Sequence, residues 1–113
     1  MPNCLFCRIA NGEIPADKVL ETPDVVVFRD INPQAPTHVL AIPRRHVPAF
    51  SALGPDDGAL LGKLAEALNR VATQEGLSDG YRVVCNNGPR AGQSVDHLHL
   101  HLLGGRDLNW PPG

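Results

Sequence analysis

The sequence predicts an α+β fold in which one long helix packs against an antiparallel β-sheet. Three observations predict it. One segment has the spacing of an amphipathic helix, several short runs have the β-branched composition of strands, and proline and glycine separate these elements. Because strand-like runs dominate, a sheet with one covering helix is the expected architecture.

The N-terminal elements are short. Residues 5–10 are expected to form a helix that ends at Asn11-Gly12, and Ile14-Pro15 then forces an extended turn. Residues 25–28 and 37–42 are rich in valine and isoleucine and are predicted strands. A loop with two prolines connects them, so an antiparallel pair is expected.

The long helix is predicted to run from residue 55 to about residue 74 and to end at Gly76. Gly58 and Gly62 each destabilise a helix interior by about 1 kcal/mol relative to alanine. They either allow another element to approach closely or are simply tolerated. The apolar residues that recur at the spacing of one helical face are Leu60, Leu61, Leu64, Ala65, Leu68, Val71 and Ala72.

The C-terminal part of the chain carries two further predicted strands. They cover residues 81–86 and 94–103, and a glycine-rich loop at 87–92 joins them. No repeat, linker or low-complexity tract interrupts the chain, so residues 1–113 are interpreted as a single domain.

Composition excludes several classes of protein. Apolar residues make up 42% and charged residues 19%, as in a globular protein. A net charge of −2 gives no basic surface for a nucleic-acid polymer. No export signal and no membrane-spanning apolar run is visible, so no membrane partner is expected. Three cysteines, an odd number, fit a reducing cytoplasm better than a secreted disulfide framework.

A row of histidines near the C-terminus is the most informative feature. In a strand over residues 94–103, alternate side chains point to opposite faces, so three histidines share one face and three leucines the other. A lone histidine is ordinarily a satisfied surface or core residue, but three on one face are hard to explain by packing. The histidines are His97, His99 and His101, and the leucines are Leu98, Leu100 and Leu102.

The spacing of these histidines disfavours a single metal ion. Residues four apart in a strand are separated by about 13 Å, too far for His97 and His101 to reach one ion through bonds of about 2.1 Å. The row is instead typical of a central nucleophile, His99, with helpers on either side. A hydrogen bond from its other ring nitrogen would fix the tautomer that leaves the attacking nitrogen bare.

Cys4 and Cys7 form a C-x-x-C pair near the N-terminus. Such a pair can be redox-active, half of a zinc site or accidental. No strand precedes it, as a thioredoxin-like motif would require, so zinc is favoured over redox chemistry. Cys85 lies in an apolar run and is interpreted as a core residue.

The chain resembles the histidine-triad (HIT) family over nearly its full length, and within that family the Hint branch. The most specific motif is the alternation of histidine and leucine at residues 97–103. The resemblance implies a HIT-like fold, a five-stranded antiparallel sheet with one long and one short helix. Further similar motifs lie at residues 13–16, 28–38, 42–46, 80–82, 92–94, 103–106 and 110–113.

The Hint resemblance implies a hydrolase that cleaves purine nucleoside 5′-phosphoramidates, such as adenosine 5′-phosphoramidate, or aminoacyl-adenylate-type compounds, to the nucleoside monophosphate. His99 would form a covalent nucleotidyl-histidine that water then cleaves. His97 and His101 would orient it and stabilise phosphoryl charge, Ser94 would bond the leaving group, and His38 would support the array from behind. No cofactor is expected to be required for catalysis.

Two alternatives stay open. One is a non-catalytic nucleotide- or zinc-binding interaction module. The other is a dinucleoside polyphosphate hydrolase or nucleotidyl transferase of a sister HIT branch, which would share the same covalent intermediate.

The nucleotide, an AMP or GMP derivative, is expected to lie beside the histidines. Under the resemblance Asp30 contacts the ribose, where a carboxylate can accept bonds from both hydroxyls; its alternative role is a turn residue at a strand end. Asn86 would hold the phosphate, and Gly92 would let backbone N–H groups approach it. The alternative for Ile9, Ile14 and Phe28 is that they are ordinary core residues. The whole set is Ile9, Ile14, Phe28, Asp30, Ile31, Asn86, Gly92, Gln93, Ser94, His99 and His101.

The resemblance also implies a metal site and an assembly. Some members of the superfamily hold a structural Zn²⁺, while others lack the cysteines. A homodimer is expected to form through the long helix and its neighbouring strand, with the Trp110 segment reaching the other subunit's active site. Asp96 stands where the family often has a bulky residue and is expected at an exposed edge. The zinc ligands here would be Cys4, Cys7, His46 and His97.

Overall fold

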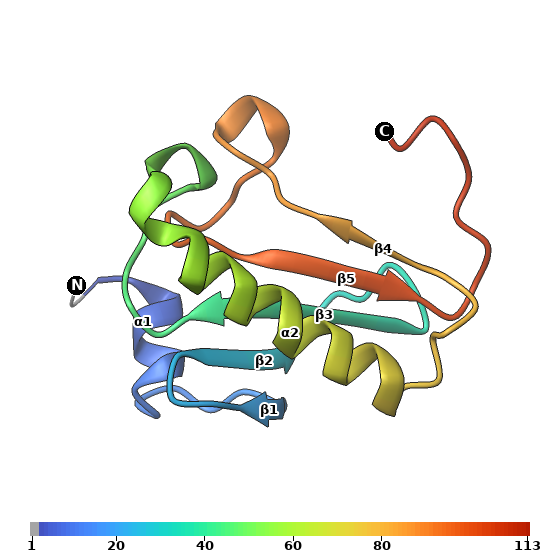
Figure 1. Ribbon diagram of the computed structural model, residues 1–113, viewed down its shortest axis with the longest axis horizontal. Helices are drawn as coiled ribbons and strands as arrows, with labels where there is room; N and C mark the ends of the chain where they lie inside the picture. Colours follow the sequence, from blue (N-terminus) through green and yellow to red (C-terminus); the bar gives the residue numbers. More distant parts are fainter. Residues whose placement is uncertain (1–2) are drawn as a thin grey trace.

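The computed structural model describes residues 3–113 and contains a five-stranded antiparallel sheet (Figure 1). The strand order is β1-β2-β3-β5-β4. This confirms the predicted α+β fold with one long and one short helix. The elements are α1 Leu5–Ala10, β1 Lys18–Glu21, β2 Val25–Arg29, β3 Thr37–Pro43, α2 Gly58–Gln74, β4 Tyr81–Val84 and β5 Leu100–Gly104, with 3₁₀ turns η1 Phe50–Ala52, η2 Pro55–Asp57 and η3 Pro89–Ala91.

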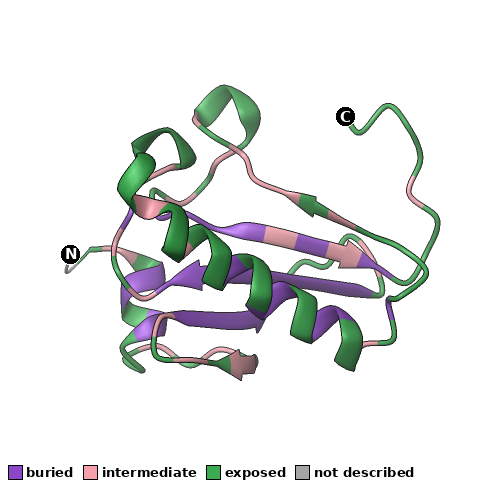
Figure 2. Cartoon of the chain, in the orientation of Figure 1, coloured by how far each residue is buried: buried purple, intermediate pink, exposed green. Residues whose placement is uncertain are grey.

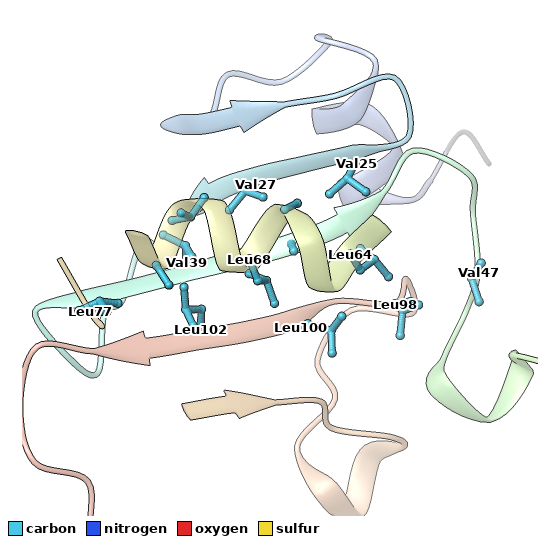
Figure 3. Close-up of a cluster of buried hydrophobic side chains, with 14 residues drawn as sticks. Val25, Val27, Val39, Val47, Leu64, Leu68, Leu77, Leu98, Leu100 and Leu102 are labelled. Carbon is cyan, nitrogen blue, oxygen red and sulfur yellow. The ribbon is translucent and has the colours of Figure 1, made fainter. Parts of the chain in front are cut away.

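Alternating residues of the central strands divide the core into two layers. Val25 and Val27 of β2 pack with α2, while Val26 and Phe28 pack with α1, so the two helices cover opposite faces of the sheet. Figure 3 shows the α2-side layer, where the helix lies over the side chains of the sheet. That layer contains Val25, Val27, Val39, Ala41, Val47, Leu64, Ala67, Leu68, Val71, Ala72, Leu77, Leu98, Leu100 and Leu102.

β1 is the strand that the sequence patterns did not locate. It pairs antiparallel with β2 at the edge of the sheet, with an irregular register between Lys18 and Leu20. Its four residues, Lys-Val-Leu-Glu, do not alternate between polar and apolar, so no strand pattern stands out. Its edge position explains why none of the four is fully buried.

β5 begins later than predicted, at Leu100 instead of residue 94. Residues 94–99 do not join the ladder between β3 and β5. The N–H of Leu98 instead donates to the carbonyl of Val47, in the segment after β3, at 2.6 Å. The alternation of faces continues through this irregular stretch, since Leu98 packs in the same layer as Leu100. β4 likewise ends at Val84 instead of residue 86.

α2 uses most of its apolar face within the chain. The predicted stripe is displaced, because Leu61 and Ala65 are exposed and Ala67 is buried. Figure 2 shows the exposed outer side of α2 and the buried central strands. The chain's own sheet therefore covers most of the apolar side of α2, so this side of the helix does not by itself require a partner. The buried helix residues are Leu64, Ala67, Leu68, Val71 and Ala72.

The ends of both helices follow local signals. α1 ends at Ala10 with Asn11 as its C-cap, and α2 ends before Gly76, whose φ of 72° lies in the left-handed region. The predicted first turn of α2 is instead the 3₁₀ turn η2, so the α-helix starts at Gly58. No described atom lies within 4 Å of a Cβ built on Gly58 or Gly62, so neither permits a close approach within residues 3–113. None of the described helices has the length and apolar character needed to cross a membrane.

Candidate active site

Four histidines meet on the face of the sheet that α1 covers. His101 of β5 lies opposite Leu40 in the register, and Leu40 packs in the α1-side layer. His38 lies two residues before Leu40 and points to the same face. The ring centroid of His101 is 5.2 Å from that of His38 and 5.2 Å from that of His99. The row from His97 to His101 is thus brought together although only His101 lies within β5.

His99 is held in one tautomer. Its Nδ1 lies 2.7 Å from the backbone carbonyl oxygen of His97. Because a carbonyl oxygen only accepts, Nδ1 carries the proton and Nε2 of the neutral ring keeps its lone pair. The ring is buried, and its Nε2 has no hydrogen-bond partner among residues 3–113. This is the form that an imidazole nucleophile requires.

Phe6 of α1 is a site residue that sequence reasoning missed. Its ring packs edge-on against His99, with centroids 5.1 Å apart and planes at 85°. Phe28 and Ile9, two expected members of the base pocket, lie with Phe6 in the buried α1-side layer, and Ile14 packs at its margin. The three- and four-residue spacing of apolar residues in α1 was the available signal, but it identifies a buried face and not its contact with His99.

A chain of hydrogen bonds fixes the tautomers of His38 and His101. The backbone N–H of Gln34 donates to His38 Nδ1 at 3.0 Å, so the proton of neutral His38 is on Nε2. That Nε2–H donates to His101 Nδ1 at 2.9 Å. The proton of neutral His101 is therefore on its Nε2, where it can donate to a ligand oxygen.

The surroundings of His101 keep its ring neutral. Burial, followed by the charged forms of His99 and His38, lowers the pKa of His101 from its ordinary value of 6.5 to about 4. The nearby Asp30 carboxylate acts in the opposite direction. At pH 7 His101 is consequently a neutral hydrogen-bond donor and not a fixed positive charge.

Asp30 and Ile31 follow β2 at the margin of the histidine cluster. Asp30 Oδ2 lies 3.4 Å from His38 Nε2, and Oδ1 accepts the N–H of Asn32 at 2.8 Å. The carboxylate therefore both faces the cluster and stabilises the turn, and its expected contact with a ribose stays a prediction. Ile31 is fully exposed and contributes nothing to the core.

The glycine-rich loop is closed by its own backbone. The N–H of Gly92 donates to the carbonyl of Pro89, and the N–H of Gln93 donates to that of Gly88, both at 3.1 Å. These two N–H groups are therefore occupied within the loop and unavailable to phosphate oxygens in this conformation. Asn86 lies half-buried beside Gly92.

The side chain of Gln93 ties this loop to its surroundings. Its Oε1 accepts the N–H of Gly88 at 2.8 Å, and its Nε2 donates to the carbonyls of Pro48 at 2.8 Å and Val95 at 3.0 Å. These three hydrogen bonds occupy the amide oxygen and both amide N–H groups of the side chain. Gln93 thus acts as a brace of the loop that leads to the histidine row.

A second cluster lies on the other side of His97. Its Nδ1 is 3.3 Å from Cys4 Sγ and 3.5 Å from Cys7 Sγ, and Cys7 Sγ is 3.3 Å from His46 Nδ1. All four ligand atoms lie within 4.8 Å of one another. Tetrahedral zinc with bonds of about 2.3 Å to sulfur and 2.0–2.1 Å to nitrogen places such atoms about 3.6 Å apart. The predicted ligand set therefore meets in a geometry that fits the ion.

The hydrogen bond of the other ring nitrogen of His97 also fits a role as zinc ligand. Its Nε2–H donates to the carbonyl of Pro43 at 2.8 Å, which leaves the Nδ1 lone pair directed at the two thiols. Burial lowers the pKa of His97, so the ring is neutral, as a metal ligand must be. A histidine that ligates zinc ordinarily donates its other N–H in this way.

A cavity of about 500 Å³ opens beside this cluster. Ser94 and Asp96 are exposed at its wall, next to Cys4 and His46. Asp96 is thus exposed, as expected. The full lining is Asn3, Cys4, Leu5, His46, Ser94, Val95 and Asp96.

Asp30, His38 and His101 form another compact group of metal-ligand types. Here the short distance between His38 Nε2 and His101 Nδ1 is already accounted for by the proton that they share. In this group His38 and His101 are therefore joined directly by a hydrogen bond.

Comparison with known proteins is consistent across sequence and structure. The family model described as HIT domain matches residues 11–108. An uncharacterized HIT-like protein from Synechocystis is 50% identical over 109 residues, covering 96% of each chain. A HIT family hydrolase from Legionella pneumophila is 51% identical and superposes with a TM-score of 0.96, covering 98% of this chain and all of the other.

Two more distant solved structures have the same architecture. A histidine triad protein from Clostridium difficile is 38% identical, with a TM-score of 0.93 and 96% of each chain covered. A histidine triad nucleotide-binding protein from Candida albicans is 35% identical, with a TM-score of 0.75, covering 96% of this chain and 83% of the other.

Proposed function

Because the chain belongs to the HIT domain family, we propose that it is a nucleotide hydrolase of the Hint branch that cleaves purine nucleoside 5′-phosphoramidates. Solved relatives named HIT family hydrolases and a relative named a nucleotide-binding protein support the general activity. The observation that carries the proposal is the bond from His99 Nδ1–H to the carbonyl of His97, which leaves Nε2 as a bare nucleophile.

The proposed reaction has two displacements at phosphorus. His99 Nε2 attacks the phosphorus, the bond to the leaving amine breaks, and the amine takes up a proton. Water then attacks the nucleotidyl-histidine, which releases the nucleoside monophosphate, returns a proton to solvent and regenerates His99. His101 Nε2–H would donate to a phosphoryl oxygen in both steps, and Ser94 would contact the leaving group.

The nucleotide would lie beside the histidine cluster, at the margin that Asp30 and Ile31 mark. Asp30 would accept from the ribose hydroxyls with the capacity left after its bond to Asn32. Asn86 would bind on the phosphate side, and the exposed Ile31 would cover the base. Because Gly92 and Gln93 use their N–H groups inside the loop, their part would be to shape the phosphate site and not to donate to it.

Product analysis tests this function. Incubation with adenosine 5′-phosphoramidate is expected to release AMP and ammonia, and a diadenosine polyphosphate assayed in parallel is expected to be a poor substrate. Cleavage of the dinucleotide alone would assign the protein to a sister branch. Binding of AMP without turnover of either compound would instead indicate the interaction-module function.

We further propose that Cys4, Cys7, His46 and His97 hold one structural Zn²⁺. Two thiolates and two imidazoles are the donors that zinc favours, and four protein ligands leave no open position for substrate. The metal would stabilise the attachment of α1 to the sheet and take no part in the chemical steps.

A homodimer in the cytoplasm completes the proposal. β4 is an edge strand, and Tyr81 and Val83 are exposed on the face that α2 covers elsewhere. Leu61 of α2 is also exposed. A second copy placed along β4 would cover this free edge and bury these side chains, and the exposed Trp110 would reach across to the partner.

A further inference from the structure

His97 belongs to both clusters of the site. Its side chain lies among Cys4, Cys7 and His46, while its backbone carbonyl accepts the Nδ1–H of His99. Its remaining ring nitrogen is fixed by the carbonyl of Pro43. A shift of the backbone that carries the His97 ring would therefore also move the carbonyl that sets the tautomer of His99.

α1 makes a second connection between the clusters. Cys4 Sγ caps this helix by accepting the N–H of Cys7 at 3.3 Å, so the thiol pair defines the first helical turn. Phe6 lies within that turn and packs edge-on against His97 at 6.0 Å and His99 at 5.1 Å. Because Phe6 and Cys7 are both buried, the turn cannot shift without disturbing the His99 ring.

From these contacts we infer that Cys4, Cys7 and His46 are positioning residues for His99, acting through the His97 carbonyl and the Phe6 ring. The inference rests on the proposed role of His99 as nucleophile. A metal held by the cluster would strengthen the effect, because it would fix His97 Nδ1 at one point relative to both thiols. The cluster thus serves the rate of the chemical step as well as the stability of the fold.

Substitutions at Cys4 separate the possible contributions. Cys4→Ser keeps a helix-capping oxygen but removes the sulfur ligand, whereas Cys4→Asp keeps both a capping oxygen and a group that binds zinc. Cys85→Ser is the matched control, because Cys85 is partly buried against the α2-side layer and has no part in the cluster. All three variants are assayed for kcat and KM with adenosine 5′-phosphoramidate.

Cys4→Ser is expected to lower kcat about ten-fold with little change in KM, as for other groups that orient a reacting residue from behind. Cys4→Asp should recover part of the loss, and Cys85→Ser should behave as the native protein. The ¹⁵N resonances of the His99 ring should change from the Nδ1–H tautomer to a mixture in Cys4→Ser alone. Native kcat and native ¹⁵N resonances in folded Cys4→Ser would overturn the inference.

Cys7→Ser provides a second test at a buried position. Cys7→Ser is expected to reproduce the kcat loss of Cys4→Ser. If Cys7→Ser does not fold, the test rests on Cys4→Ser, because Cys4 is only half-buried. His99→Ala separates this inference from the proposed function. Turnover that survives His99→Ala would reject the nucleophile, while the ¹⁵N resonances in Cys4→Ser would still report whether the cluster positions the ring.

Discussion

His38 donates its Nε2–H to Nδ1 of His101 across 2.9 Å, and this bond joins two adjacent strands of the sheet at the candidate active site. It follows from a backbone contact, since the N–H of Gln34 occupies the other nitrogen of His38. The direction in which His101 can donate is therefore set by the loop that precedes β3.

His38→Phe removes this bond while keeping a ring of similar size. We expect kcat to fall about ten-fold or more, because His101 Nδ1 loses the donor that keeps the His101 proton on Nε2. KM should change little. Thr37→Val is the control, because Thr37 is a neighbouring buried residue on the opposite face of the strand. The kcat values of both variants are measured by steady-state kinetics. Equal kcat values for the two folded variants would contradict this role of the hydrogen bond.

His99→Ala should abolish almost all turnover and leave nucleotide binding largely intact, because it removes the group that forms the covalent bond. His101→Ala should have a milder effect. Rapid quenching of the native enzyme is expected to trap a phosphorus–nitrogen adduct on His99, detectable by mass spectrometry. An active His99→Ala protein, or a native protein with no adduct, would show that another group attacks.

The pKa of His101 predicts how stability depends on pH. The folded ring has a pKa of about 4 and the unfolded one about 6.5, so between these values the unfolded chain binds more protons. The free energy of unfolding should therefore fall as the pH is lowered from about 6.5 to about 4. Urea denaturation of His101→Gln should show a shallower fall over this window. His38, His99 and Asp30 face this position in both proteins, so they are common to the comparison. Identical slopes would therefore mean that His101 itself does not contribute.

Metal analysis of protein prepared without chelators should find about one equivalent of zinc per chain. Chelation should lower the melting temperature, because the ion would join α1 to the sheet through His97. Cys4→Ser should lower it in the same way, and Cys85→Ser should not. Protein free of zinc with both Cys4 and Cys7 open to thiol reagents would leave the cluster as a metal-free contact.

Light scattering at micromolar concentration should give about twice the 12.1 kDa monomer mass. Val83→Glu should shift the mass toward the monomer, because it places a charge on the free edge of β4. Gly62→Leu, on the exposed side of α2, should weaken the dimer as well. Glu13→Lys, exposed after α1, is the control. A monomer mass for the native chain would exclude the dimer.

The sequence predicts those elements whose signals are local. The bounds of α1, the end of α2 at Gly76 and the pairing of β2 with β3 follow from glycine, proline and apolar spacing within each segment. β1 has no such pattern, and the start of β5 depends on the carbonyl of Val47, far away in the chain.

The same distinction applies to the candidate site. Alternation alone places the histidines on one face, because the extended direction persists through the irregular residues before β5. The packing of Phe6 on His99 and the bond from Gln34 to His38 join segments through tertiary folding or loop conformation. No periodicity in the sequence encodes either contact.

The strand order has a consequence for biosynthesis. β3 occupies the middle of the sheet, yet one of its two neighbours, β5, is made only after α2 and β4. During translation the growing chain therefore exposes one edge of β3 until residue 104 has left the ribosome. The sheet can then close in a single late event that also assembles the histidines, so the nascent protein acquires its fold and its reactive centre together.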